Sequence, residues 1–167
     1  MDFRLVNPES IAWKRGHGTN VVAGVPGGGK VVVQTPKCAC VVSLHSPGTF
    51  RVSMKLKQLD PVHREFERWL KRVEESASGP WKTQRAIRSA VYSSSFSVMA
   101  FSDTMAFDES GKLSAELASA KSCSALIELS GAWTGDGVWG PRWKIAQLKF
   151  WTTGDPDECL FVDDDDD

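Results

Sequence analysis

The sequence predicts a mainly β fold, in which a barrel of five or six strands carries one amphipathic helix and is followed by an acidic tail. Segments with the alternation or the β-branched residues of strands lie on both sides of one helical segment, at about residues 61–75. Charge is also unevenly distributed. Eight of the 21 acidic residues lie within residues 155–167, so the rest of the chain carries 20 basic and 13 acidic side chains. A body of net charge +7 therefore precedes a tail of net charge −8.

The first strands are expected at residues 31–34, 38–44 and 49–58. In the third of these, apolar and polar residues alternate: Phe50, Val52, Met54 and Leu56 against Arg51, Ser53, Lys55 and Lys57. A period of two turns the apolar set toward the core and the cations outward. The pattern predicts a basic outer face on the sheet and leaves open whether that face binds a ligand or is simply solvated.

The helix is expected to begin after Asp60-Pro61, because aspartate caps helix N-termini and proline suits the first helical position. Its apolar face consists of Val62, Phe66, Trp69, Leu70 and Val73. This spacing indicates that the helix packs on the sheet and that Trp69 is a core residue.

Further strands are expected at residues 91–101, 125–133 and 139–151, and Asp136-Gly137 favours a tight hairpin between the last two. The alternation within residues 139–151 is imperfect, which indicates a β-bulge or a strand buried on both faces.

Three strands, a helix and then more strands is the element order of an OB-fold, a barrel whose strand face and loops bind single-stranded nucleic acid. A sixth strand and the long loops would be insertions, and a mixed α+β sheet with one covering helix is the alternative. Residues 1–154 are expected to form this domain. Residues 155–167 are expected to be a disordered tail, because five adjacent negative charges repel one another. These charges belong to Asp163, Asp164, Asp165, Asp166 and Asp167.

Several classes of protein are not supported. No apolar run approaches the ~20 residues of a membrane-spanning helix, and the N-terminus lacks the pattern of a secretory signal. We therefore expect an intracellular protein. Cys38, Cys40, Cys123 and Cys159 lack the spacing of zinc ligands, which favours reduced, buried thiols. No cofactor, metal site or catalytic residue is expected.

The segment from Gly24 to Lys30 matches most of a phosphate-binding P-loop. A P-loop needs Ser or Thr after the lysine and then a helix, whereas Val31 and the β-branched run after it favour a strand. A mobile glycine-rich hairpin loop is therefore the preferred interpretation, and a nucleotide hydrolase using Lys30 is a remote alternative.

Cations stand beside tryptophans in two further segments: Trp81, Lys82 and Arg85 in one, and Trp139, Arg142, Trp143 and Lys144 in the other. Aromatic rings that are exposed beside cations stack on unpaired bases while the cations contact phosphates. The alternative for each tryptophan is a core position with a neighbouring cation that extends to solvent.

The residues Glu128-Leu-Ser-Gly-Ala-Trp133, followed by Trp139-Gly-Pro-Arg-Trp143-Lys-Ile-Ala-Gln-Leu-Lys149-Phe, resemble the C-terminal strand pair of the OB-fold single-stranded DNA-binding proteins of large DNA viruses and phages. The strand-and-helix layout and the acidic C-terminus are also similar. The chain departs from several acidic-tailed members of this group in ending on Asp instead of an aromatic residue. The resemblance implies an accessory protein of replication or recombination, without a catalytic centre.

The sequence thus predicts a non-catalytic single-stranded DNA-binding protein. Arg51, Lys55 and Lys57 would form a cationic strand face, and the two tryptophan-containing segments would supply stacking and phosphate contacts. The tail would compete with DNA and recruit replication proteins. The alternative is a structural or assembly module built on a β-barrel, without nucleic-acid specificity. Preference for DNA over RNA and the formation of a homodimer remain open.

Overall fold

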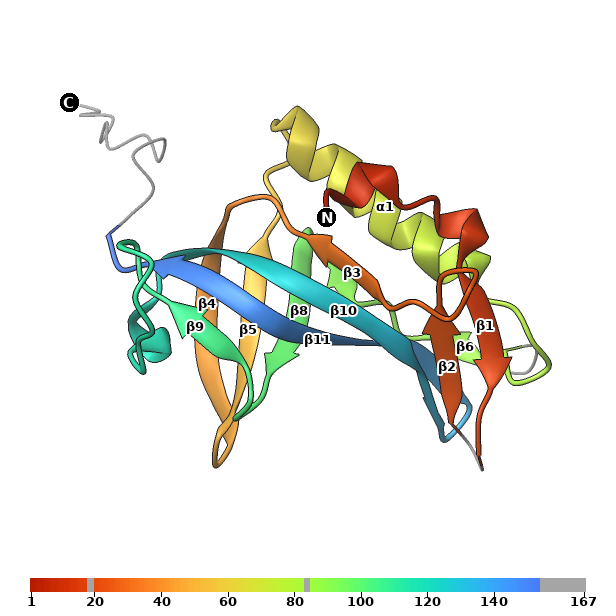
Figure 1. The fold of residues 1–167 in the computed structure, drawn as a ribbon. Helices are drawn as coiled ribbons and strands as arrows, with labels where there is room; N and C mark the ends of the chain where they lie inside the picture. Colours follow the sequence, from red (N-terminus) through yellow and green to blue (C-terminus); the bar gives the residue numbers. More distant parts are fainter. Residues whose placement is uncertain (18–19, 83–84, 154–167) are drawn as a thin grey trace, which may run out of the picture.

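The computed structural model describes residues 1–17, 20–82 and 85–153. Its centre is a closed barrel that confirms the predicted OB-like fold with one helix (Figure 1). The strands around the barrel are β10 (Ser122–Gly135), β4 (Cys38–Ser46), β5 (Thr49–Lys55), β8 (Ser95–Ala100) and β11 (Val138–Trp151), which pairs with β10 again. All these pairings are antiparallel except the one between β8 and β11.

One detail of the strand count differs from the sequence expectation. β3 (Val31–Gln34) pairs with residues 126–129 of β10, and β4 continues along the same strand at residues 122–123. Pro36 lies in the short interruption, and Thr35 spans it. Its N–H donates to the Ala125 carbonyl at 2.8 Å, and its side-chain hydroxyl accepts from the Ala125 N–H at 3.0 Å. β3 and β4 therefore occupy the place of one barrel strand, so the helix follows the second barrel strand and not the third.

Helix α1 (Pro61–Ser76) matches the prediction almost residue for residue. The Asp60 carboxylate accepts hydrogen bonds from the N–H groups of Val62 and His63, at 2.8 and 3.3 Å. Phe66 and Trp69 are buried on its inner face, where Phe3 from the 3₁₀ turn η1 (Phe3–Leu5) meets Phe66 edge to face at 5.1 Å. A second 3₁₀ turn, η2 (Pro8–Ser10), continues along the helix.

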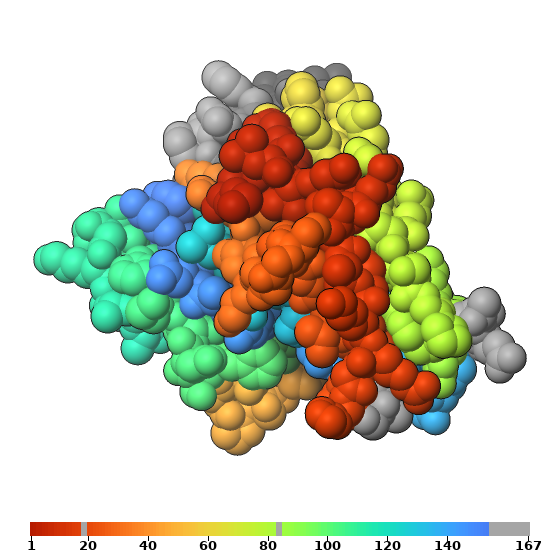
Figure 2. Space-filling model, turned by 45° about the vertical axis from the view of Figure 1, so that its right-hand side comes forward, coloured from red at the N-terminus to blue at the C-terminus, as the bar shows by residue number. Residues whose placement is uncertain are grey.

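The β10–β11 hairpin extends beyond the barrel and supports a second small core. β2 (Val21–Gly24) pairs with β10 there, β1 (Ala12–Arg15) pairs with β2, and β6 (Ala86–Ile87) pairs with β11. The small core holds Val21, Ala77, Trp81, Ala132 and Trp139. Figure 2 shows the N-terminal residues, red to orange, lying across the cyan and blue strands.

The expected strand at residues 91–101 is folded as a tight hairpin. β7 (Val91–Tyr92) turns back through Ser93 and Ser94, whose φ values of 47° and 60° are those of a two-residue hairpin turn, and β8 follows. β9 (Met105–Phe107) pairs with β11, and the 3₁₀ turn η3 (Leu117–Ser119) precedes β10.

The hairpin between β10 and β11 turns at Asp136-Gly137, as predicted. The expected bulge is also present, as a register shift that leaves Ala146 between the pairs Ile127–Ile145 and Leu126–Gln147.

Cys38, Cys40 and Cys123 are buried free thiols, as predicted, and burial raises the pKa of Cys38 to about 12. Cys159 and the aspartates of the tail lie outside the described residues. Within the described part of the chain, no group of three or more His, Cys, Asp or Glu side chains is placed to hold a metal ion. No helix there is long and apolar enough to cross a membrane.

Candidate nucleic-acid interface

The outward sides of β5, β8 and β11 form one continuous surface, which we call the β5–β8 face. Strand register aligns Arg51 with Met99 and Met99 with Lys144, so two cations and a thioether share one row across three strands. The next rows pair Ser53 with Ser97, whose hydroxyl oxygens are 3.0 Å apart, and Lys55 with Ser95. Arg51, Lys55 and Lys144 are thus the predicted cations that the structure gathers on this face.

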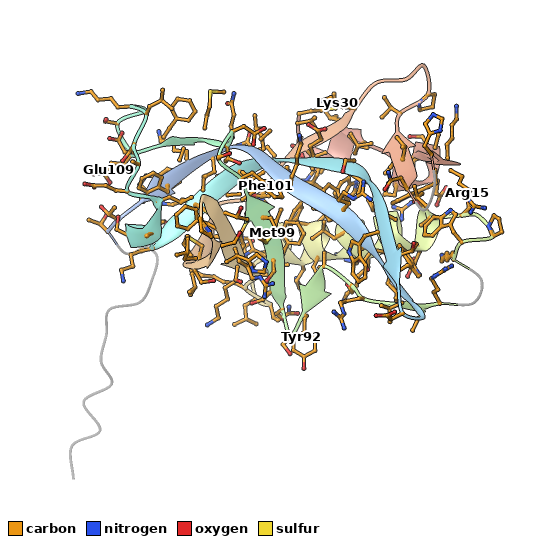
Figure 3. The ribbon with its side chains drawn as sticks, turned by 90° about the horizontal axis from the view of Figure 1, so that it is seen from below. Arg15, Lys30, Tyr92, Met99, Phe101 and Glu109 are labelled. Atoms are coloured by element: carbon orange, nitrogen blue, oxygen red, sulfur yellow. The ribbon has the colours of Figure 1, made fainter. Side chains whose placement is uncertain are left out.

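Two exposed aromatic rings mark the ends of β8. Tyr92 pairs with Ser95 through the β7–β8 hairpin and is 82% exposed, and Phe101 follows β8 directly and is 43% exposed. Figure 3 shows Tyr92, Met99 and Phe101 following one another along β8, seen from below. Phe101 is six positions after Ser95, the partner of Tyr92, which places the two rings about 20 Å apart at ~3.3 Å per residue.

The outer side of β11 continues this surface toward the β10–β11 turn through Gly140, Arg142 and Lys144. The half-buried Trp133 ring lies across Gly140, where a Cβ atom would approach the ring to 2.7 Å. Arg88 lies over the Trp133 ring, 5.9 Å from its centroid. The guanidinium of Arg142 donates a hydrogen bond to the Ala132 carbonyl at 3.0 Å, which holds it against β10.

The three tryptophans expected to stack on bases lie in the two cores. Trp81, Trp139 and Trp143 are 8, 1 and 6% exposed. Trp139 meets Trp81 edge to face at 5.2 Å, while Trp143 packs against Trp69 and Phe96. Other rings therefore cover these faces, and direct stacking on bases is not available to them in this fold. The core alternative raised for each tryptophan is the one that the structure adopts.

The remaining predicted cations lie apart from the β5–β8 face or at its margin. Lys82 donates a hydrogen bond to the Ala77 carbonyl at 2.9 Å, just beyond the end of α1, and lies over the Trp139 ring at 5.6 Å. Arg85 is exposed and donates to the Trp81 carbonyl at 2.7 Å. Lys57 follows β5 and is half-buried, with its backbone N–H bound to His63 Nδ1 at 2.9 Å.

The site residues predicted from the sequence did not include Tyr92, Met99, Phe101 and Trp133. Part of the signal was present, because Phe96, Val98 and Ala100 define the inward phase of β8 and thus place Met99 and Phe101 outward. An apolar residue on the outward phase is a candidate contact residue when its neighbours on that phase are serines, as Ser95 and Ser97 are here. The position of Trp133 depends on the hairpin register, which no local pattern reveals.

The glycine-rich segment forms a short hairpin loop, closed between Val25 and Gly29, that joins β2 to β3, and these two strands follow one another along β10. Val25 N–H binds the Gly29 carbonyl at 2.9 Å, and Gly27 and Gly28 adopt φ values of 92° and 88°. A strand follows Lys30, so the loop lacks the helix that a P-loop requires. This geometry agrees with the preferred interpretation of the segment as a hairpin loop.

Comparison with solved structures confirms the family resemblance at the level of the fold. Gp2.5, a single-stranded DNA-binding protein encoded by bacteriophage T7, superposes with a TM-score of 0.54 and 8% identity, over 76% of this chain and 96% of that chain. The single-stranded DNA-binding protein from bacteriophage Enc34 gives a TM-score of 0.47 and 9% identity, over 92 and 96% of the two chains. No family model and no curated protein sequence matches the chain.

Proposed function

We propose that the chain is a non-catalytic single-stranded DNA-binding protein of DNA replication or recombination. The observation that carries this proposal is the β5–β8 face, on which three cations lie among two exposed aromatic rings and a half-buried thioether: Arg51, Lys55 and Lys144 with Tyr92, Phe101 and Met99. In OB-folds this strand face and the adjacent loops hold single strands. The shared fold with gp2.5, which is named as a single-stranded DNA-binding protein, supports the same assignment.

The chemistry of the face suits an unpaired strand. Each base has two ring faces, so Tyr92 and Phe101 can stack on bases of any sequence, at about 1–3 kcal/mol per ring. The cations between them would contact successive phosphates, and Met99 would cover the sugar or base between the rings. Duplex DNA keeps its bases stacked on each other and offers no ring face to these side chains.

Equilibrium binding of labelled oligo-dT and of a matched duplex, measured by fluorescence anisotropy at several salt concentrations, tests the proposal. We expect preference for the single strand and a steep loss of affinity with salt, because bound cations release counterions from the strand. Equal affinity for both DNA forms together with stable self-association would instead support the assembly-module alternative. An RNA strand of the same sequence, measured in parallel, decides between DNA and RNA.

The acidic residues 155–167 are proposed to compete with the strand and, once displaced, to recruit replication proteins. Their net charge of −8 opposes the +7 of the preceding residues. Truncation after Gly154 should therefore tighten binding of oligo-dT, most at low salt where electrostatic screening is weakest. Unchanged or weaker affinity of the truncated chain at low salt would contradict competition by the tail.

A further inference from the structure

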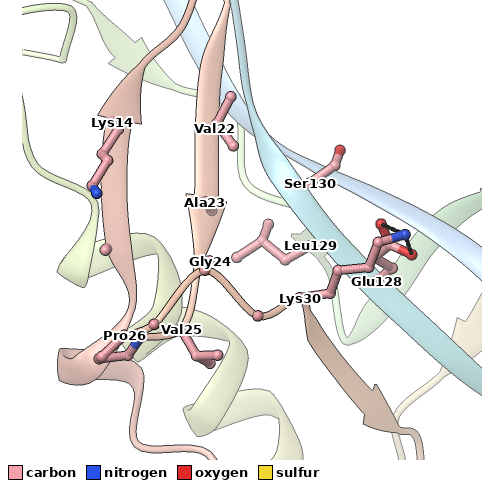
Figure 4. Close-up of a pocket in the computed structure, with 14 residues that line it drawn as sticks. Lys14, Val22, Ala23, Gly24, Val25, Pro26, Lys30, Glu128, Leu129 and Ser130 are labelled. Carbon is pink, nitrogen blue, oxygen red and sulfur yellow. Dashed lines mark hydrogen bonds and ion pairs between the residues drawn. The ribbon is translucent and has the colours of Figure 1, made fainter.

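A hollow of about 400 Å³ lies between the glycine-rich hairpin and β10, away from the β5–β8 face. The outer sides of β1 and β2 and residues Glu128 to Ser130 of β10 line it, and the hairpin covers one side (Figure 4). This volume is in the range of small-ligand sites. The hairpin wall is largely backbone, because Gly24 and Gly29 lie too close to neighbouring atoms for a side chain. A flat ligand can therefore approach the main chain closely.

Among the polar side chains that line the hollow, the carboxylate of Glu128 is unusual in its burial. Glu128 is 8% exposed, and its oxygens lie 3.3 Å from Lys30 Nζ and 3.9 Å from Lys144 Nζ. Lys144 belongs to the β5–β8 face, whereas Lys30 stands at the mouth of the hollow with 70% of its side chain exposed. Glu128 thus connects the two surfaces through one buried group.

Lys30 can leave the Lys30–Glu128 pair without isolating the buried charge, because Lys144 Nζ remains 3.9 Å from a Glu128 oxygen and the exposed Lys30 ammonium returns to solvent. The buried carboxylate still needs a donor, since an unsatisfied buried acceptor is costly. A nucleobase amino group can replace the Lys30 ammonium on Glu128. Lys30 on this side and Lys14 on the far side of β2 are then available for the flanking phosphates (Figure 4).

From this geometry we infer that the hollow is a base-binding subsite, in which Glu128 accepts a hydrogen bond from the amino group of one base of the bound strand. The inference rests on the proposed function, because the occupant is a base of the strand that reaches the hollow past Lys144. An acceptor-only carboxylate favours the cytosine edge, which presents an N4 amino group, over the thymine edge, which presents the O4 carbonyl at the same place. The subsite therefore adds a base preference to a surface that is otherwise sequence-tolerant.

The test is the ratio of affinities of the full chain for dC and dT oligomers of equal length. We expect dC to bind roughly tenfold more tightly, the size expected for one hydrogen bond to a charged acceptor. Glu128→Gln should bring the two affinities to within about twofold, because an amide offers a donor as well as an acceptor. Val22→Phe is a second variant that leaves Glu128 intact and fills the hollow from an exposed strand position. It should abolish the preference in the same way.

Equal binding of dC and dT by the unsubstituted chain, or a preference that survives both substitutions, overturns the subsite and leaves single-strand binding intact. Failure of either oligomer to bind overturns the proposed function as well. Free dCMP carries the same amino group as a cytosine of the strand, so its binding tests whether the hollow takes a free nucleotide instead. If dCMP binds, Glu128→Gln abolishes that binding and the oligomers show no preference, the hollow is a site for a free nucleotide and the inference is overturned.

Discussion

The two sides of strand β11 differ in what they contact, although the same short segment supplies both. Trp139 and Trp143 point inward and are covered by other aromatic rings, whereas Gly140, Arg142 and Lys144 lie on the outer side. A sequence in which tryptophans and cations alternate therefore separates them by strand period into a core and a charged surface. Proximity in sequence between an aromatic residue and a cation does not make them partners in one binding site.

The largest effect should come from the inner side. Trp143→Ala removes a buried ring that packs against Trp69 and Phe96, and we expect the free energy of unfolding to fall by about 3–5 kcal/mol. Urea unfolding followed by circular dichroism measures this. Trp143→Phe is the control and should lose much less. A stable Trp143→Ala protein with weakened DNA binding would place this ring on the ligand side.

An intermediate effect should come from the exposed ring of Tyr92. Tyr92→Ala should weaken oligo-dT binding by about 1–3 kcal/mol without lowering stability, because its ring is available for stacking and contributes little to the core. Tyr92→Phe keeps the ring and should bind as the unsubstituted chain does. Equal affinity of the alanine and phenylalanine variants would remove Tyr92 from the interface.

The smallest effect should come from one cation on the outer side. If Lys144 contacts one phosphate as proposed, Lys144→Gln should make the slope of log affinity against log salt shallower by about 0.7. Arg68→Ala is the matched control, because Arg68 is exposed on α1 beside the N-terminal residues 3–8 and is not part of the β5–β8 face. A change of slope in Arg68→Ala as large as that in Lys144→Gln would show a general effect of net charge and not a contact.

Local patterns predicted the elements of this fold well. The capped helix after Asp60, the alternation in β5 and the Asp136-Gly137 turn each have a cause within a few residues. The joining of β3 and β4 into one barrel strand was not predictable, because it depends on pairing with β10 about 90 residues later in the chain.

The candidate interface was predicted only in part for a related reason. Arg51 and Lys55 follow from the period of a single regular strand. Placing the tryptophans of β11 in the core or on the surface requires knowing which residues of the strand point inward. The bulge at Ala146 interrupts the alternation that would show this. Tyr92 was missed because the chain reverses at Ser93-Ser94, where a pair of serines replaces the usual asparagine or glycine of such turns.

The barrel closes where β8 meets β11 in a short parallel pairing at Met99 and Lys144, two strands far apart in the chain. Pairing two strands so far apart in the chain costs more loop-closure entropy than forming the neighbouring hairpins does. This junction should therefore form late in folding, and its amides should exchange with solvent sooner than those of the β10–β11 hairpin. A strand that lies across Met99 and Lys144 would hold both sides of the junction together. Bound DNA would then stabilise the closed barrel, and slower hydrogen exchange of these amides would report its binding.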